Sequence, residues 1–167
     1  EASGISVLGP EGGSAFVYMY ADEGDDNADK YWLKTEQDGT GFLIQNYVSG
    51  GQENNFRTVG DGTTELYYDG VKKFETTSDG ATVSGKIIAE VTGTSTVAAT
   101  FINSGSTADG TEVQIQNKTG TPADGDQTGY LQFQGNDSAG NMTIFNAIIS
   151  TMDDVTDGSE DGSFYFY

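Results

Sequence analysis

The dipeptide Asp-Gly occurs eight times in 167 residues, and this feature most restricts how the chain can fold. Asp and Gly tolerate the positive φ angles of the tight turns that join antiparallel strands. The total of 24 Gly is also about twice the usual frequency. The pattern predicts a chain that reverses direction repeatedly. The eight dipeptides begin at Asp38, Asp61, Asp69, Asp79, Asp109, Asp124, Asp157 and Asp161.

Short runs rich in β-branched and aromatic residues lie between these turns and predict strands. No stretch of helical length keeps a 3.6-residue period without Gly or β-branched clusters, and the nearest candidate is 86–91. We therefore predict an all-β fold of short antiparallel strands and hairpins. The predicted strands are 5–8, 16–20, 31–34, 42–46, 65–68, 71–75, 81–84, 97–103, 112–117, 130–134, 142–149 and 163–167.

The predicted strands are of two kinds. Residues 112–117 and 130–134 alternate apolar side chains with amides or a phenol, as expected for strands with one wet face. Residues 16–20 and 144–149 are apolar on both faces, which favours strands covered on both sides. In a small oligomer, a neighbouring subunit would supply the second cover.

Residues 66–74 predict a hairpin whose register depends on its loop. A two-residue Asp69-Gly70 loop would place Leu66 opposite Lys73, with Phe74 on the other face. A three-residue loop, with Gly70 as a left-handed bulge, would place Leu66 and Phe74 on the same face. We favour the three-residue loop.

The chain is poor in core-forming residues. Leu, Ile, Val and Phe together number 33 of 167, and this fraction, with the high charge, also fits a disordered chain. The 9 Tyr, 9 Phe and 1 Trp, grouped in strand-like runs, argue against disorder. The remaining route to stability is association, in which copies of the chain cover one another's apolar faces. We therefore expect an obligate oligomer.

Charge and composition exclude several function classes. The chain has 7 Lys+Arg and 26 Asp+Glu, a net charge of −19, which disfavours nucleic acid and anionic membrane as partners. No apolar run approaches the roughly 20 residues of a membrane helix, so we expect no membrane insertion. Cys and His are absent, which removes thiol nucleophiles, Ser–His–Asp triads and thiolate or imidazole metal ligands.

A weak internal repeat suggests two modules. Asp-Gly-Thr followed after three residues by Ile-Gln-Asn occurs at 38–46 and again at 109–117. We therefore expect a first β module at 1–85, a connector at 86–95 and a second β module at 96–167. Because the chain begins at Glu1 and stops within an aromatic alternation, we also expect it to be a segment of a longer protein.

Three stretches, 13–38, 65–85 and 129–164, carry a resemblance to a known class of proteins. They resemble segments of tail-fibre and other virion structural proteins of tailed bacteriophages, especially those of marine and aquatic bacteria. The resemblance covers about half of the chain. It implies an elongated, intertwined or β-prism-like homotrimeric fibre, a location on the virion and a part in host attachment. It implies no catalytic residue.

An acidic loop is the main candidate for binding a metal ion, and a second acidic group, Asp153, Asp154, Asp157, Glu160 and Asp161, is a weaker one. Asp22, Asp25, Asp26, Asn27 and Asp29 lie within eight residues and offer oxygen ligands of the kind that Ca²⁺ prefers. The spacing fails the calcium-loop template, because Gly24 precedes the acidic cluster and no bidentate Glu follows at the required distance. We therefore expect a solvated turn and no cofactor, with Ca²⁺ as the alternative.

Two aromatic pairs are candidates for binding a sugar ring. Tyr31-Trp32 and Tyr67-Tyr68 are amphipathic enough to serve as stacking platforms, but we favour packing in the core or at a subunit interface. An acidic pair could hydrolyse polysaccharide, yet spacing does not single out any two of the 26 carboxylates. We predict that the chain is not an enzyme.

These observations and the resemblance lead to one expectation. It is a structural segment of a phage tail fibre, located on the virion, that presents loops for attachment to the host surface. The expected partners are two further copies of the chain, other virion proteins and a host surface glycan or protein. The alternatives are a capsid-decorating or head fibre, a glycan-binding receptor module and a polysaccharide depolymerase.

Overall fold

The computed structural model describes residues 4–92, 97–105 and 110–167. The chain divides into two compact units, Glu1–Ala98 and Ala99–Tyr167, each with one antiparallel sheet. The all-β prediction is thereby confirmed. The helical elements among the described residues are two single turns, η1 (Asp22–Gly24) and η2 (Asn27–Asp29). Within those same ranges, no helix has the length and apolarity to cross a bilayer.

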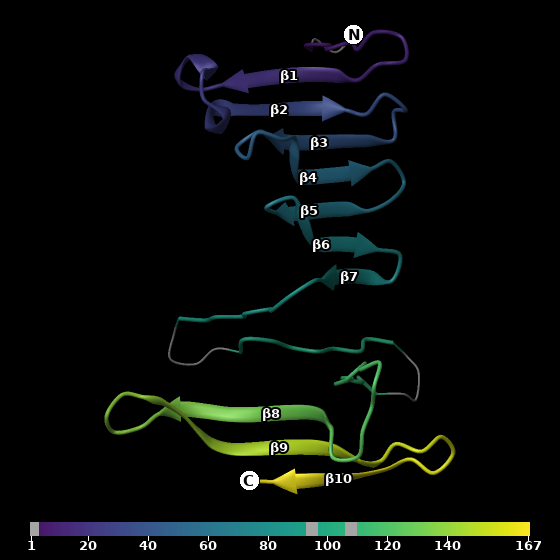
Figure 1. Cartoon of the computed structure of the whole chain (residues 1–167), viewed down its shortest axis with the longest axis vertical. Coiled ribbons are helices and arrows are strands. Elements are labelled where there is room, and N and C mark those ends of the chain that lie inside the picture. Colours follow the sequence, from purple (N-terminus) through teal and green to yellow (C-terminus); the bar gives the residue numbers. More distant parts are fainter. Residues whose placement is uncertain (1–3, 93–96, 106–109) are drawn as a thin grey trace. The chain divides into compact units, whose positions relative to one another are not determined.

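The first unit is a seven-stranded meander. Each strand pairs antiparallel with the next one in the chain, so the order in the sheet is the order in the sequence (Figure 1). The strands are β1 (Ala15–Tyr20), β2 (Lys30–Thr35), β3 (Gly41–Asn46), β4 (Glu53–Val59), β5 (Thr64–Tyr68), β6 (Val71–Thr77) and β7 (Gly80–Val83).

The second unit is a three-stranded meander of β8 (Gln127–Asn136), β9 (Met142–Asp154) and β10 (Asp161–Phe166), with β9 in the centre (Figure 1). Pairing continues one residue beyond β10, because the backbones of Ala147 and Tyr167 exchange two hydrogen bonds of 3.0 Å. The predicted connector at 86–95 and the predicted start of the second module at 96 extend into residues 93–96, outside the described residues.

The Asp-Gly dipeptides mostly occupy chain reversals. Those beginning at Asp38, Asp61, Asp69, Asp79, Asp124 and Asp157 lie in turns, whereas the one at Asp161 opens β10 beside a register shift. The dipeptide at Asp109 begins outside the described residues. Short turns of this kind connect only adjacent antiparallel strands, which explains why both sheets are simple meanders.

The predicted length of the hairpin loop at 66–74 is wrong, although Leu66 and Phe74 do lie on the same face, as predicted. Tyr68 pairs with Val71, so the loop is the two residues Asp69 and Gly70, with φ of 52° and 68°. Leu66 nevertheless lies opposite Phe74, because β6 contains one extra residue, Lys73, between its pairs with Leu66 and Tyr67. The bulge therefore lies within the strand and not in the loop.

Three predicted strands are wrong, and one strand was not predicted. Residues 5–8, 97–103 and 112–117 form no strand, because no described segment of the chain pairs with them. The 86–91 candidate is not helical either. The strand that was not predicted is β4, with sequence ENNFRTV, in which Phe56 and Val59 are the only apolar residues.

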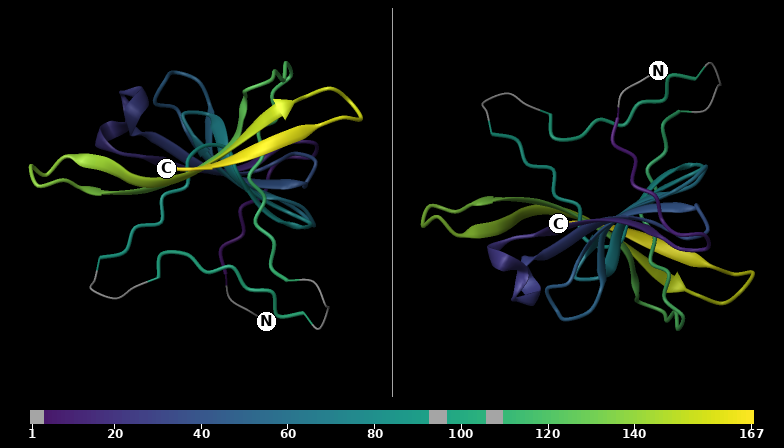
Figure 2. Two further views of the ribbon diagram at one scale, coloured as in Figure 1. Left: turned by 90° about the horizontal axis from the view of Figure 1, so that it is seen from below. Right: turned by 90° about the horizontal axis from the view of Figure 1, so that it is seen from above.

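Neither sheet has a second layer within the described part of its unit. Figure 2 shows the strands of each sheet fanning out with the usual twist. Among the described residues, the buried apolar side chains are Trp32, Leu43 and Ala147. Of the two strands predicted to be apolar on both faces, β1 is exposed in the single chain: Tyr18 and Met19, neighbours on its opposite faces, are 56% and 46% exposed, whereas β9 buries Ala147.

Candidate functional site

The strand register of the first unit aligns one apolar residue from every strand into a single row. Directly paired residues lie on the same face of a sheet, so this row can be followed from partner to partner. The row is Val17, Leu33, Ile44, Phe56, Leu66, Phe74 and Val83. We call the face that carries it the apolar face.

The apolar face continues on both sides of this row. Met19, Tyr31, Tyr68 and Val71 lie on the side of the row that contains the Asp69-Gly70 turn, and Phe42 lies on the other side. Among the register-paired residues of this face, Glu53 is the only charged one. Tyr68 is 75% exposed and Leu66 is 46% exposed, so no described residue of the first unit covers this part of the sheet.

The opposite face, which we call the charged face, has a different character. Its register-paired residues include six charged ones: Lys30, Lys34, Arg57, Glu65, Lys72 and Glu75. Aromatic residues gather at one end, where the rings of Phe16 and Tyr18 stack with centroids 5.4 Å apart. The first sheet is therefore amphipathic, with its charges concentrated on one side.

A chain of side-chain hydrogen bonds crosses the middle of the charged face. Trp32 Nε1 donates to Gln45 Oε1 at 2.7 Å, and Gln45 Nε2 donates to Asn54 Oδ1 at 2.7 Å. Trp32 and Gln45 are each only 5% exposed. Buried polar groups are costly unless they are paired, so these bonds hold β2, β3 and β4 in one register.

Glu65 is the centre of a second polar cluster and is 7% exposed. Its carboxylate accepts hydrogen bonds from Tyr67 Oη at 2.6 Å and Lys72 Nζ at 3.2 Å, and it lies 3.6 Å from Arg57 Nη1. Lys72 also contacts Glu75, and Arg57 Nη2 contacts Glu36 at 3.0 Å. These contacts link strands β4, β5 and β6.

The environment of Glu65 determines its protonation. The hydrogen bond from Tyr67, followed by the contacts with Lys72 and Arg57, lowers the pKa of Glu65 despite its burial. Burial and the Glu65 carboxylate together raise the pKa of Tyr67. A carboxylate held ionised in this way is a poor proton donor at neutral pH, so the cluster suits structural cross-linking better than general acid catalysis.

The structure separates the members of each predicted aromatic pair. Trp32 and Tyr31 point to opposite faces of β2, and Trp32 is buried with its indole nitrogen bonded to Gln45. Tyr67 and Tyr68 likewise lie on opposite faces of β5, with Tyr67 bonded to Glu65 and Tyr68 exposed. Neither adjacent pair presents two rings on one surface.

The acidic loop brings some of its predicted ligands together. Carboxylate oxygens of Asp25, Asp26 and Asp29 lie within 4.8 Å of one another, while Asp22 is not part of this group. Asp26 and Asp29 form a reciprocal capping arrangement around η2, in which the backbone N–H of Asp26 donates to Asp29 Oδ2 at 3.3 Å. This local hydrogen bonding gives Asp26 and Asp29 a structural role in η2.

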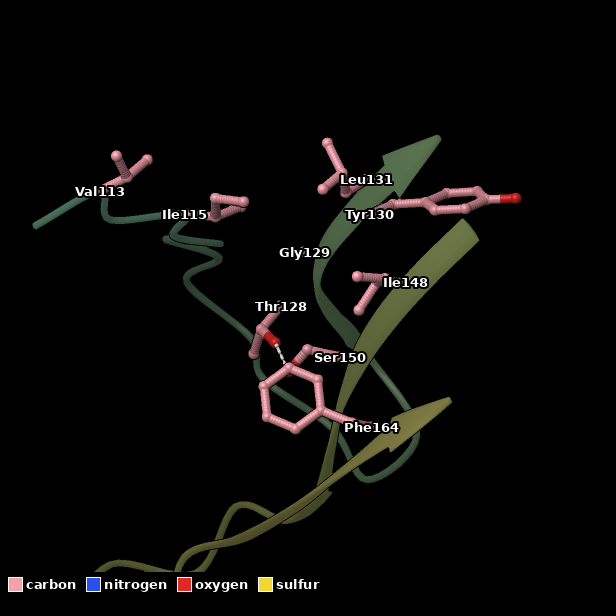
Figure 3. Close-up of a pocket in the computed structure, with 9 residues that line it drawn as sticks. All are labelled: Val113, Ile115, Thr128, Gly129, Tyr130, Leu131, Ile148, Ser150 and Phe164. Atoms are coloured by element: carbon pink, nitrogen blue, oxygen red, sulfur yellow. Dashed lines mark hydrogen bonds between the residues drawn. The ribbon is translucent and has the colours of Figure 1, made fainter. Parts of the chain in front are cut away.

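The second unit contains an apolar hollow of about 250 Å³. Val113 and Ile115 lie on one side of it, and Leu131 and Ile148 lie on the sheet across from them (Figure 3). At its floor, Thr128 Oγ1 donates to Ser150 Oγ at 2.6 Å. Residues 112–117 thus keep the predicted alternation of side chains, with Val113 and Ile115 at the hollow, although their backbone pairs with no strand.

Comparison with known proteins adds no family to this description. No protein-family model, curated protein or solved structure matches the chain.

Sequence reasoning missed the apolar row and the two polar clusters on the charged face. The sequence indicated only one part of the row, namely that Leu66 and Phe74 lie on the same face of the sheet. The rest depends on long-range register, including the irregularity in β4 that lets Ile44 pair with Phe56 and Gln45 with Asn54.

Proposed function

We propose that this chain is a structural segment of a phage tail fibre that assembles as a homotrimer on the virion. The observation that carries the proposal is the near absence of a core: among the described residues, only three apolar side chains are buried. The resemblance of 13–38, 65–85 and 129–164 to tail-fibre segments supports the class of protein.

The surface area gives this argument a magnitude. The chain exposes 13039 Å², whereas a folded monomer of 17.6 kDa exposes about 7,900 Å². A standard-size interface of about 1,600 Å² between the two units would remove less than half of the excess. Contacts with copies of the same chain are the simplest way to bury the remaining excess surface, since each copy carries the same exposed faces.

The proposed role is mechanical and presentational. Two meanders that extend by adding strands suit an elongated fibre, and three copies would display every loop three times. Weak contacts of these loops with a host surface glycan or protein would then be strengthened by avidity. Other virion proteins would be partners at the ends of the segment, and no cofactor is required.

Native mass in solution tests the proposal. We expect a species three times the mass of the chain at micromolar concentration, measured by native mass spectrometry and sedimentation velocity. A compact, cooperatively melting monomer under the same conditions would contradict it. If the mass is trimeric, labelling intact particles with an antibody against the chain would distinguish the tail from the head of the virion.

A further inference from the structure

We infer that the apolar face of the first sheet is the surface on which copies of this chain pack together. The inference rests on the proposed function, because it assigns to one face the association that the proposal requires. Its occupant is a second copy of the same chain, and in a trimer each copy would turn this face toward the common axis.

The exposed area of this face is large enough for the role. Eight of its large apolar side chains each expose more than a third of their surface: Val17, Met19, Tyr31, Phe42, Leu66, Tyr68, Val71 and Val83. With about 200 Å² for a fully exposed aromatic side chain, Tyr31, Phe42 and Tyr68 alone contribute on the order of 300 Å², and the five Val, Leu and Met side chains add to this area. A stable interface buries about 800 Å² per partner, whereas the largest apolar patch of a typical monomer is about 300 to 600 Å².

The geometry of the face also suits packing between identical copies. The apolar row crosses all seven strands, and six strand spacings give it a length of about 29 Å. It runs perpendicular to the strands, along the direction in which the sheet grows. Identical rows can therefore lie side by side along a symmetry axis in that direction, with like residues at like heights.

The distribution of charge excludes the opposite face from the same role. The charged face carries six charged residues in register pairs, and burying it would require desolvating the ion pairs of Glu65, Arg57 and Lys72. The apolar face carries Glu53 alone among its paired residues.

Thiol accessibility tests this assignment directly, because the sequence contains no cysteine. We would introduce Val83→Cys on the apolar face and Thr82→Cys on the charged face, two neighbouring positions of β7 that are both exposed in the single chain. Leu66→Cys adds a position in the middle of the apolar row. Each full-length variant would be reacted with a maleimide under native and denaturing conditions, and its native mass would be measured in parallel.

We expect a trimeric mass for all three variants. The native labelling rate at Leu66→Cys and Val83→Cys should be at least tenfold below that at Thr82→Cys, and all three rates should become equal in denaturant. A trimer in which the three thiols react equally fast would overturn the face assignment and leave the proposed function standing. A monomeric mass for the unmodified chain would overturn both.

Discussion

The two sheets differ in how much of their structure the single chain can stabilise. The seven-stranded sheet buries Trp32, Leu43, Gln45, Asn46 and Glu65 and ties its middle strands together with side-chain hydrogen bonds. The three-stranded sheet buries only Ala147 among its described side chains. Its two faces carry the apolar rows Leu131–Ile148–Phe166 and Tyr130–Ile149–Tyr165. Under the proposed assembly, the first unit would need partner copies to cover its apolar face, and the second unit would need them to cover both of its apolar rows.

The largest effect should come from placing a charge in the apolar row. Leu66→Lys would bury an unpaired ammonium between copies, at a cost of several kcal/mol, so the native mass should fall from trimer to monomer. Hydrogen exchange in the resulting monomer should then show loss of amide protection first in β8–β10, with β2–β5 the last to exchange.

Thr82→Lys is the matched control, because it adds the same charge on the charged face, opposite Glu75. It should leave the mass trimeric. Earlier loss of protection in β2–β5 than in β8–β10 would reverse our ranking of the two sheets.

The next largest effect should come from the packing inside the first unit. Trp32→Ala removes a buried ring and leaves Gln45 Oε1 without its donor, so we expect the unfolding free energy of the first unit to fall by about 3 to 5 kcal/mol. Tyr20→Ala, on the same face but 56% exposed, should cost less than about 1 kcal/mol. Urea titration followed by hydrogen exchange would measure both, and equal costs would show that Trp32 is not a core residue.

Turn glycines should give a smaller effect that is similar in both units. Gly70 and Gly140 have φ of 68° and 85°, so Gly70→Ala and Gly140→Ala should each cost about 1 to 2 kcal/mol. Gly51→Ala is the control, since Gly51 has an ordinary φ and its nearest neighbour to an added Cβ is 3.9 Å away. Thermal melts would detect the difference. A cost at Gly51 equal to that at Gly70 would mean that backbone conformation is not the cause.

Acid should produce the smallest effect, in both units. Hydrogen bonds lower the pKa of Glu65, chiefly the one from Tyr67, and the pKa of Asp137, chiefly those from Asn141. A lowered folded-state pKa adds stability above the unfolded values of about 4.5 and 3.8, and this stability is lost as the pH falls through the folded value. Melting temperatures of Glu65→Gln and Asp137→Asn should therefore depend less on pH below about 4.5 than that of the unaltered chain. Parallel curves would refute the linkage.

Much of the secondary structure could be predicted from local sequence. The Asp-Gly turns and the aromatic and β-branched runs predict nine of the strands, since turn conformation and strand propensity are local properties. The same reasoning failed at 5–8, 97–103 and 112–117, because a strand also needs a partner. It failed at β4 for the opposite reason: the strand is mostly polar, and its side chains Asn54 and Arg57 contact Gln45 of β3 and Glu65 of β5.

The candidate site could be predicted only in fragments. The acidic loop and the aromatic pairs were visible as clusters in the sequence, yet adjacent strand residues point to opposite faces, which separates Tyr31 from Trp32 and Tyr67 from Tyr68. The extra residue at Lys73 brings Leu66 and Phe74 together, and no turn signal indicates a bulge at that position.

The sequence by itself determined that this chain is an all-β protein with frequent turns, a strong negative charge and too few apolar residues for a conventional core. Only the tertiary structure decided which side chains share a face, and so produced one apolar row across seven strands and the polar clusters behind it. The physical reason is that turn and strand preferences act over a few residues, whereas register is set by pairing along whole strands. A single extra residue in a strand moves every side chain beyond it to the opposite face.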